Sequence, residues 1–96
     1  MPGVSEPQSA AYWTELRIFL QVATERSFNK AALSLGVTHP TVGRAVRRLE
    51  DELGTALVAE AYARGVKLTA AGERLARQLA KVDRQIAGML ARFEPS

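Results

Sequence analysis

Apolar residues recur along the chain at the three- and four-residue spacing of amphipathic helices. The first such segment places four of them at the i, i+3, i+4 and i+7 positions of one helix face, and these are Leu16, Phe19, Leu20 and Ala23. Thr14 is a good N-cap residue, so the pattern predicts a helix from Thr14 to about Arg26. Residues 1–11 are rich in Pro, Ser and Gly, and we expect them to form a flexible arm.

A short second helix is predicted from Phe28 to Leu35. Ser27 precedes it as an N-cap, and Gly36 follows it where a left-handed backbone conformation ends a helix. We expect the side chain of Val37 to tuck under that turn.

A third helix follows after a very short connection. Thr38 is its N-cap, and because proline is tolerated only in the first turn, the helix must begin at His39 or Pro40. Gly54 ends it. The residues expected to be buried recur every three or four positions and are Val42, Val46, Leu49 and Leu53. Two helices joined by a short glycine-containing turn are typical of a helix-turn-helix.

Two short apolar or β-branched runs come next, residues 56–61 and 66–68. Ala63, Arg64 and Gly65 separate them, which predicts a small β-hairpin, or wing.

The last segment is predicted to be one long helix, residues 72–93, which Thr69 caps and in which the acidic Glu73 suits the helix dipole. Six apolar residues form a seam with spacings of 4, 3, 4, 3 and 4, namely Leu75, Leu79, Val82, Ile86, Met89 and Phe93. About twenty helical residues span roughly 30 Å, which is longer than a domain of this size covers. The seam therefore favours a homodimer over packing of the helix on its own domain, although Gly88 lies in the helix interior.

Composition excludes several classes of protein. The 96 residues are enough for one domain, and the absence of cysteine excludes disulfides, thiolate zinc sites and cysteine nucleophiles. The only carboxylate cluster, residues 50–52, is consecutive and suits a solvated helix end better than acid–base catalysis. We expect the protein to have no enzymatic activity and to bind no metal ion or cofactor. The N-terminus lacks the features of a signal peptide, and no apolar run is long enough to span a membrane.

The net charge of +3 is modest, but its distribution is informative. Between residues 28 and 67 the chain carries six basic residues, which are Lys30, Arg44, Arg47, Arg48, Arg64 and Lys67. Three of the four acidic residues in that range lie together at the far end of the third helix, and the fourth is Glu60 in the wing. The pattern predicts a basic face at the helix-turn-helix, which is expected to attract nucleic acid.

Four motifs add a family resemblance: LRxFLxVA from Leu16, SFxxAAxxL from Ser27, LExELGxxL from Leu49 and LTxAGExL from Leu68. Together they cover about sixty residues, and the chain resembles the N-terminal domain of LysR-type transcriptional regulators. The resemblance implies a mainly α winged helix-turn-helix over residues 12–69, with a linker and dimerisation helix over residues 70–93. It also implies promoter DNA as the partner and the bacterial cytoplasm as the location. Members of the family also carry a large effector-binding domain, which does not appear in these 96 residues. The chain is therefore expected to be either a DNA-binding fragment or a natural stand-alone relative; we favour the fragment and expect no effector site within it.

The sequence departs from the family pattern at three places. The third helix starts with Thr38-His39-Pro40 where the family often has Ser-Gln-Pro, which changes the base preference expected there. Gly43 replaces a common Ser, losing a hydroxyl but letting the backbone approach DNA. Glu60 occupies a place in the wing where an arginine is common, and Arg64 at the tip is placed to compensate.

The candidate DNA contacts follow from the predicted helix faces. The recognition helix, residues 39–53, is expected to enter the major groove, with Arg44 as the best candidate for a bidentate guanine contact. Arg64 suits a minor groove, and residues at the start of the second helix suit the backbone. The full set of expected contacts is Ser27, Asn29, Lys30, Thr38, His39, Pro40, Thr41, Gly43, Arg44, Arg48, Arg64 and Lys67.

Several alternatives stay open on the sequence alone. His39 is either a base contact or a surface histidine, and Arg47 is either a DNA contact or the i+4 partner of Asp51. Tyr12 and Trp13 are expected before the first helix, where they pack it to the core or a partner rather than stack on bases. The competing function is a protein-interaction module that modulates another regulator by heterodimerising through the seam.

Overall fold

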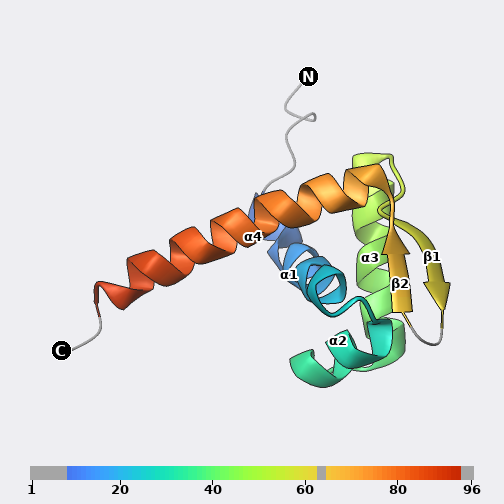
Figure 1. The fold of residues 1–96 in the computed structure, drawn as a ribbon, viewed down its shortest axis with the longest axis horizontal. Coiled ribbons are helices and arrows are strands. Elements are labelled where there is room, and N and C mark those ends of the chain that lie inside the picture. Colours follow the sequence, from blue (N-terminus) through green and yellow to red (C-terminus); the bar gives the residue numbers. More distant parts are fainter. Residues whose placement is uncertain (1–8, 63–64, 94–96) are drawn as a thin grey trace.

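The computed structural model describes residues 9–62 and 65–93 (Figure 1). Three helices form the body of the domain, a two-stranded antiparallel hairpin follows, and a long helix crosses over them. The elements in chain order are α1 (Ser9–Glu25), α2 (Phe28–Leu35), α3 (His39–Leu53), β1 (Val58–Tyr62), β2 (Gly65–Leu68) and α4 (Ala70–Ala91). This confirms the predicted winged helix-turn-helix and long C-terminal helix. No helix in these two ranges has the length and apolar character needed to cross a membrane.

The helix caps predicted for α2, α3 and α4 are confirmed. The hydroxyl oxygen of Ser27 accepts from the backbone N–H of Lys30 at 3.1 Å, and that of Thr69 accepts from Gly72 at 3.0 Å. At the other ends of α2 and α3, Gly36 and Gly54 have φ values of +71° and +67°. Only glycine adopts this left-handed conformation without a steric penalty, so these two residues end their helices where the sequence predicts.

The start of α1 differs from the prediction. The helix begins at Ser9, so Thr14 lies inside it rather than at its N-cap, and Tyr12 and Trp13 belong to the helix. No Gly or Pro follows Pro7 within this segment, and alanines are the strongest helix formers, so nothing stops the helix from starting earlier. Residues 1–8 of the expected arm lie outside the described residues.

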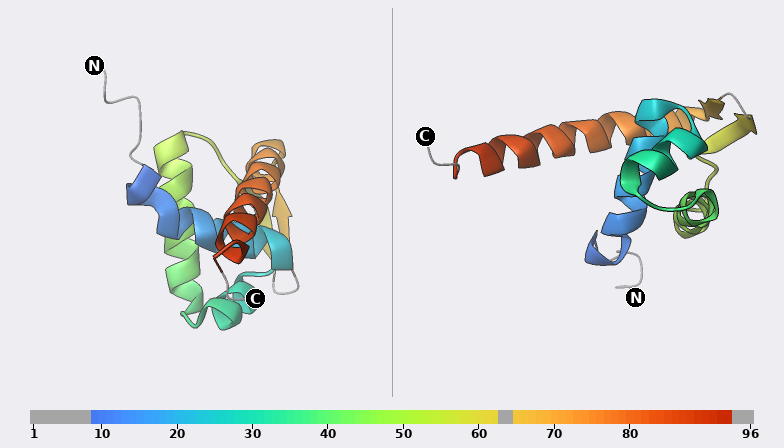
Figure 2. Two further views of the ribbon diagram at one scale, coloured as in Figure 1. Left: turned by 90° about the vertical axis from the view of Figure 1, so that its left-hand side faces the viewer. Right: turned by 90° about the horizontal axis from the view of Figure 1, so that it is seen from below.

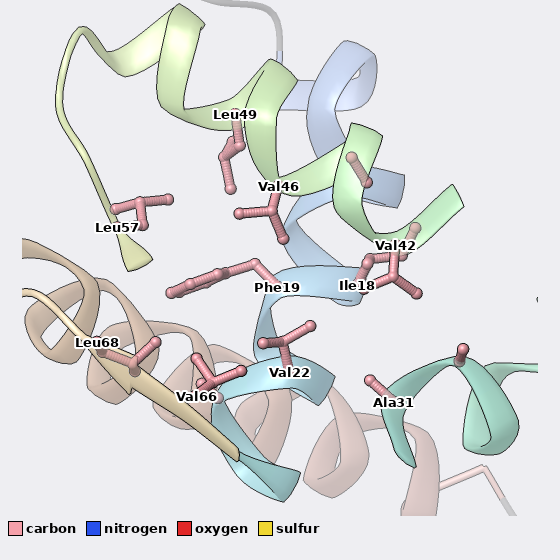
Figure 3. Packing of buried hydrophobic residues seen from close by; sticks show 13 residues of the cluster. Ile18, Phe19, Val22, Ala31, Val42, Val46, Leu49, Leu57, Val66 and Leu68 are labelled. Carbon is pink, nitrogen blue, oxygen red and sulfur yellow. The ribbon is translucent and has the colours of Figure 1, made fainter. Parts of the chain in front are cut away.

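The core is centred on Phe19 of α1, whose side chain has no solvent exposure. Figure 3 shows it between Val46 and Leu49 of α3 on one side and residues of β2 on the other. Leu53, expected to continue the α3 stripe, is 46% exposed because it lies in the last turn of α3, beyond the core. Val37 is also exposed, although its N–H donates to the carbonyl of Ala32 as the predicted turn requires.

Tight backbone contacts hold α4 against the loop that precedes the wing. The N–H of Thr69 donates to the carbonyl of Leu57 at 2.9 Å, and its hydroxyl donates to the carbonyl of Ala56 at 2.7 Å. A Cβ atom on Gly72 would lie 2.2 Å from the carbonyl oxygen of Leu57. Position 72 therefore needs glycine because the helix approaches the loop backbone too closely for a side chain.

An ion pair ties the end of α1 to the start of α4. The guanidinium of Arg26 donates two hydrogen bonds of 3.0 Å to the carboxylate of Glu73. These bonds lower the pKa of Glu73 from its ordinary value and raise that of Arg26. Arg26 reaches this position from a left-handed backbone, with φ of +54°. The sequence pattern indicates only a helix-dipole role for Glu73 and no structural role for Arg26.

The long helix α4 packs on its own domain only along its first half. Leu75 and Leu79 of the predicted seam pack against the core, whereas Ile86, Met89 and Phe93 are 36%, 49% and 81% exposed. Figure 2 shows the second half of α4 extending away from the other helices. The first part of the seam thus packs inside the domain, whereas its last part forms an uncovered apolar surface.

Candidate nucleic-acid interface

The start of α3 presents a hydrogen-bonded set of polar side chains. The hydroxyl of Thr38 accepts from the N–H of Thr41 at 3.3 Å and lies 2.9 Å from the hydroxyl of Thr41. The guanidinium of Arg44 donates to that same Thr41 hydroxyl at 3.3 Å. Arg44 is exposed, and its guanidinium has further N–H donors besides the one bonded to Thr41. The predicted face of α3 is therefore assembled before any ligand binds.

A groove of about 490 Å³ separates α3 from the first strand of the wing. His39, Gly43, Arg44 and Arg47 line its helical side, and Val58 to Ala61 line its strand side. The ring of His39 meets Phe28 of α2 edge-on, with centroids 5.5 Å apart, which fixes its orientation at the helix start. Gly43 contributes no side chain, so the backbone of α3 is open to the groove.

The groove contains charges of both signs. Arg44 and Arg47 lie on its helical wall and Glu60 on its strand wall, and all three are exposed. The neighbouring Glu60 carboxylate raises the pKa of Tyr62 above its ordinary value. Arg47 forms no ion pair with Asp51 among the described residues, so the alternative that placed it in such a pair is wrong.

The start of α2 reaches the same side of the molecule. A second, smaller groove of about 260 Å³ brings Asn29 together with His39 and with the end of β1 at Tyr62. Asn29 and Lys30 are exposed there. Ser27, by contrast, is 9% exposed and its hydroxyl oxygen already caps α2, so its predicted DNA contact is limited to the edge of this groove.

The wing places Lys67 opposite Glu60. These two residues are cross-strand partners in the hairpin, so their side chains project from the same face. Lys67 is exposed. The pairing of the strands shifts between Val58 and Glu60, so that β1 has one residue more than β2 at this point, as in a β-bulge. Arg64, which the sequence places at the tip, lies outside the described residues.

Arg48 lies apart from the other predicted contacts. Its guanidinium approaches the carboxylate of Glu15 on α1 at 3.4 Å, although its side chain is 68% exposed. Glu15 is buried, and its other carboxylate oxygen has no hydrogen-bond partner in the structure. Of the three residues predicted to share this face of α3, Arg48, the one nearest the C-terminal end of α3, therefore contacts α1.

Glu50 has a structural role that the sequence pattern does not indicate. The side chain of Glu50 accepts hydrogen bonds from the N–H groups of Leu57 and Val58, at 2.8 and 3.1 Å. It therefore fixes the start of β1 against α3 and sets the width of the groove. Glu50 is followed by Asp51 and Glu52, and consecutive acidic residues at a helix end are usually exposed to solvent. The sequence pattern therefore does not indicate that Glu50 bonds to the backbone of another segment.

A model of a bacterial regulatory helix-turn-helix protein, lysR family, matches residues 13–73 of the chain. The chain is 43% identical over 67 residues to the HTH-type transcriptional regulator BudR of Klebsiella aerogenes, covering 70% of the chain and 46% of BudR. It is 43% identical over 79 residues to the HTH-type transcriptional activator AmpR of Pseudomonas aeruginosa, covering 82% of the chain and 26% of AmpR. The chain thus spans less than half of these relatives.

Solved structures show the same fold. The DNA-binding domain of BenM, in complex with catB site 1 DNA, superposes with a TM-score of 0.75 at 33% identity, over 82% of this chain and 87% of that one. The CbnR DNA-binding domain in its DNA complex gives a TM-score of 0.71 at 30% identity, over 82% of this chain and 90% of that one. Full-length OxyR C199D from Pseudomonas aeruginosa gives 0.75 at 35% identity, over 86% of this chain and 28% of OxyR.

Proposed function

Since the chain belongs to the lysR family of bacterial regulatory helix-turn-helix proteins, we propose that residues 12–69 bind duplex DNA sequence-specifically, with the start of α3 in the major groove. The observation that carries the proposal is the exposed Thr38–Thr41–Arg44 set beside an open groove. The BenM and CbnR DNA-binding domains, whose structures are DNA complexes, support it through their similarity of fold.

Arg44 is the proposed base-reading residue. A guanidinium pairs with the O6 and N7 atoms of guanine through two hydrogen bonds, and such a pair discriminates against other bases by about 1–3 kcal/mol. The hydroxyl of Thr41 orients the guanidinium before binding, which reduces the entropy lost on contact. Thr38 and His39 border the same helix start, where the helix N-terminus favours phosphate.

The surrounding residues are proposed to set the register on the DNA backbone. Asn29 and Lys30 lie at the start of α2, and Lys67 lies on the wing, so all three suit phosphate contacts that carry no sequence information. Pro40 and Gly43 contribute close approach of the backbone rather than hydrogen bonds. We assign Arg48 to the contact between α3 and Glu15, with a phosphate contact only at the edge of the interface.

The uncovered half of α4 is proposed to pair with a second copy of the chain. Ile86, Met89, Leu90 and Phe93 leave an apolar strip exposed next to a groove of about 530 Å³ between α1 and α4. A homodimer covers this strip, and it presents two recognition helices to two half-sites of one operator. Such a DNA-binding dimer acts in the bacterial cytoplasm, where the chromosome lies.

Selection of bound sequences from a random duplex pool tests the DNA proposal. The protein is expected to enrich a sequence with two related half-sites, whereas Arg44→Ala is expected to enrich none, because the base-specific contact is lost. Arg74→Ala is the control, since it removes the same charge from an exposed site on α4 outside both the α3 interface and the α1–α4 groove, and it should still enrich the wild-type sequence. Absence of binding to any duplex at low salt would instead favour the heterodimerising interaction module.

A further inference from the structure

On one face of α4 every charged residue is basic. The charged residues of this face, here called the basic face, are spaced at i, i+3, i+7, i+10 and i+18, which share one side of a helix. They are Arg74, Arg77, Lys81 and Arg84 of α4 and Arg92 at its C-cap. All five are exposed. They account for every basic residue between Ala70 and Phe93.

The acidic residues of α4 leave most of the positive charge of this face uncompensated. The carboxylate of Glu73 is bonded to Arg26, the residue after α1, although its charge also acts on Arg77. Asp83 lies on the opposite side, where it lines the groove between α1 and α4. Within residues 9–62 and 65–93 the ion pairs are Arg26–Glu73 and Arg48–Glu15, neither of which uses a residue of the basic face. The positive charge of this face is therefore available to a partner.

The basic face is also separate from the apolar seam. Leu79, Val82, Ile86 and Leu90 line the α1–α4 groove, whereas a shallow depression on the basic face is lined by α4 residues only. Apart from the charged residues that depression contains Gln78 and Ala80, so it offers no large apolar side chain. A dimer formed through the seam leaves the basic face open.

Like charges three and four residues apart on a helix repel one another and destabilise it. Arg74 and Arg77, Arg77 and Lys81, and Lys81 and Arg84 are all such pairs. An anionic partner that spans the face relieves all three repulsions at once, because each phosphate or carboxylate it brings lies between two cations.

We propose that the basic face of α4 binds the phosphate backbone of duplex DNA outside the stretch that α3 contacts, without sequence preference. Four of its five residues are arginines, whose planar guanidinium matches a phosphate with two hydrogen bonds. Protein–protein contacts depend on buried aromatic or aliphatic anchors, and this face has none. The inference rests on the proposed function, in that DNA is the ligand of the other face.

The length and direction of the face fit flanking DNA. From Arg74 to Arg84 the helix rises about 15 Å, and to Arg92 about 27 Å, which is long enough to follow several phosphates of one strand. Figure 1 shows the α2–α3 turn at one end of the domain and α4 crossing the other. The DNA that contacts α4 is therefore not the stretch bound by α3. It is flanking DNA that bends around the domain or continues beyond the stretch bound by α3.

Salt dependence on duplexes of two lengths tests the proposal. A duplex of roughly 20 base pairs holds two half-sites, and one of roughly 60 base pairs adds flanks around the same selected site. Neutralising the face with Arg77→Gln, Lys81→Gln and Arg84→Gln together removes its central charges without adding bulk. Arg77→Lys with Arg84→Lys is the matched control, because it keeps the charge at the same positions. Circular dichroism verifies that every variant keeps its helical content.

The wild-type protein is expected to show a steeper slope of log K against log salt on the long duplex, by roughly two to three, since each neutralised phosphate adds about 0.9 to the slope. The Gln variant is expected to show equal slopes on both lengths, and the Lys control to keep the difference. Equal wild-type slopes on both lengths would overturn the proposal. So would a Gln variant that binds both duplexes like the wild type but loses affinity for polyglutamate, which would indicate an acidic protein partner.

Failure of the proposed function gives a different result. In that case no sequence is enriched from the random pool and no variant of α3 changes discrimination, whatever the length of the duplex. A protein that binds the short duplex specifically but shows no effect of length refutes only the role of the basic face.

Discussion

Replacing Gly72 by alanine adds a single methyl group at the junction between α4 and the wing. The new Cβ would lie 2.2 Å from the carbonyl oxygen of Leu57 and 3.0 Å from its carbonyl carbon. Both atoms belong to the backbone, so no side-chain rotation relieves the contact. The start of α4 must move by about 1 Å to restore an ordinary van der Waals distance. That movement stretches the two hydrogen bonds from Thr69 to Leu57 and Ala56.

The expected cost follows from these contacts. Overpacking in a close contact costs about 1–3 kcal/mol, and weakening of the hydrogen bonds adds about 1 kcal/mol. Alanine gains at most about 1 kcal/mol over glycine in a helix. The free energy of unfolding of Gly72→Ala should therefore be lower than that of the wild type by about 1–3 kcal/mol. In a chain of this length this lowers Tm by roughly 5–20 °C.

Gly88 provides the matched control on the same helix. No atom lies within 4 Å of the Cβ that alanine would add there, so Gly88→Ala gains helix propensity without a clash. Its Tm should rise by roughly 4–8 °C. Thermal unfolding is followed by circular dichroism at one fixed protein concentration, because a dimer makes Tm depend on concentration. A Gly72→Ala protein that melts at or above the wild-type temperature would refute the close approach of α4 to Leu57.

The remaining predictions concern the core, the α1–α4 ion pair and the wing. Phe19→Ala empties the centre of the core and should lower the free energy of unfolding by about 3–5 kcal/mol in urea titrations, whereas the exposed Leu33→Ala should change it little. The carboxylate of Glu73 has a lowered pKa in the folded state, so its contribution to stability is present above the unfolded pKa of about 4.3 and is lost as pH falls through the folded value. Stability curves of the wild type and Glu73→Gln should therefore converge as pH falls from about 5 to below 4, and a constant difference would contradict the ion pair. Glu50→Ala leaves the N–H groups of Leu57 and Val58 without their acceptor and should lower the free energy of unfolding by about 1–3 kcal/mol. Amide hydrogen exchange in β1, measured relative to that in α1, should be faster in the variant than in the wild type. Equal exchange rates in wild type and variant would show that Glu50 does not hold the strand.

Local chemistry made much of the fold predictable. The caps at Ser27, Thr38 and Thr69 and the left-handed glycines at Gly36 and Gly54 each act within a few residues of their position. Their effect therefore depends on the adjacent sequence and not on the tertiary structure. The start of α1 was wrong for a related reason. A good cap residue such as Thr14 permits a helix to begin but does not require it when helix-forming residues precede it.

Contacts between distant segments were the part that sequence patterns did not reveal. Arg26 and Glu73 are 47 positions apart, and Glu50 reaches the backbone of Leu57 and Val58 across the loop after α3. Nothing in the spacing of these residues indicates such contacts, because each depends on how the helices are packed. Helical periodicity likewise placed Arg48 on the face of Arg44 but did not reveal Glu15 of α1 beside it.

The seam of α4 shows how a correct pattern can serve two purposes. Its 3.5-residue spacing predicted a continuous apolar face, and the structure has that face. Only the tertiary arrangement shows that Leu75 and Leu79 are used by the domain itself, whereas Ile86 and Met89 remain uncovered. The site was predictable to a similar degree. The sequence predicted the exposed polar face of α3, but it did not predict the groove that Glu50 and Glu60 help to line beside it.

Binding selection from a random duplex pool, carried out in parallel with the wild type and Arg44→Ala, tests the central claim most directly. The account predicts that the wild type enriches one sequence with paired half-sites containing guanine, and that its affinity for that sequence exceeds its affinity for random duplex by about 10-fold or more. Arg44→Ala should bind all duplexes with similar affinity. Enrichment of the same sequence by both proteins would contradict the role of Arg44, and enrichment of none by the wild type would contradict sequence-specific binding by α3.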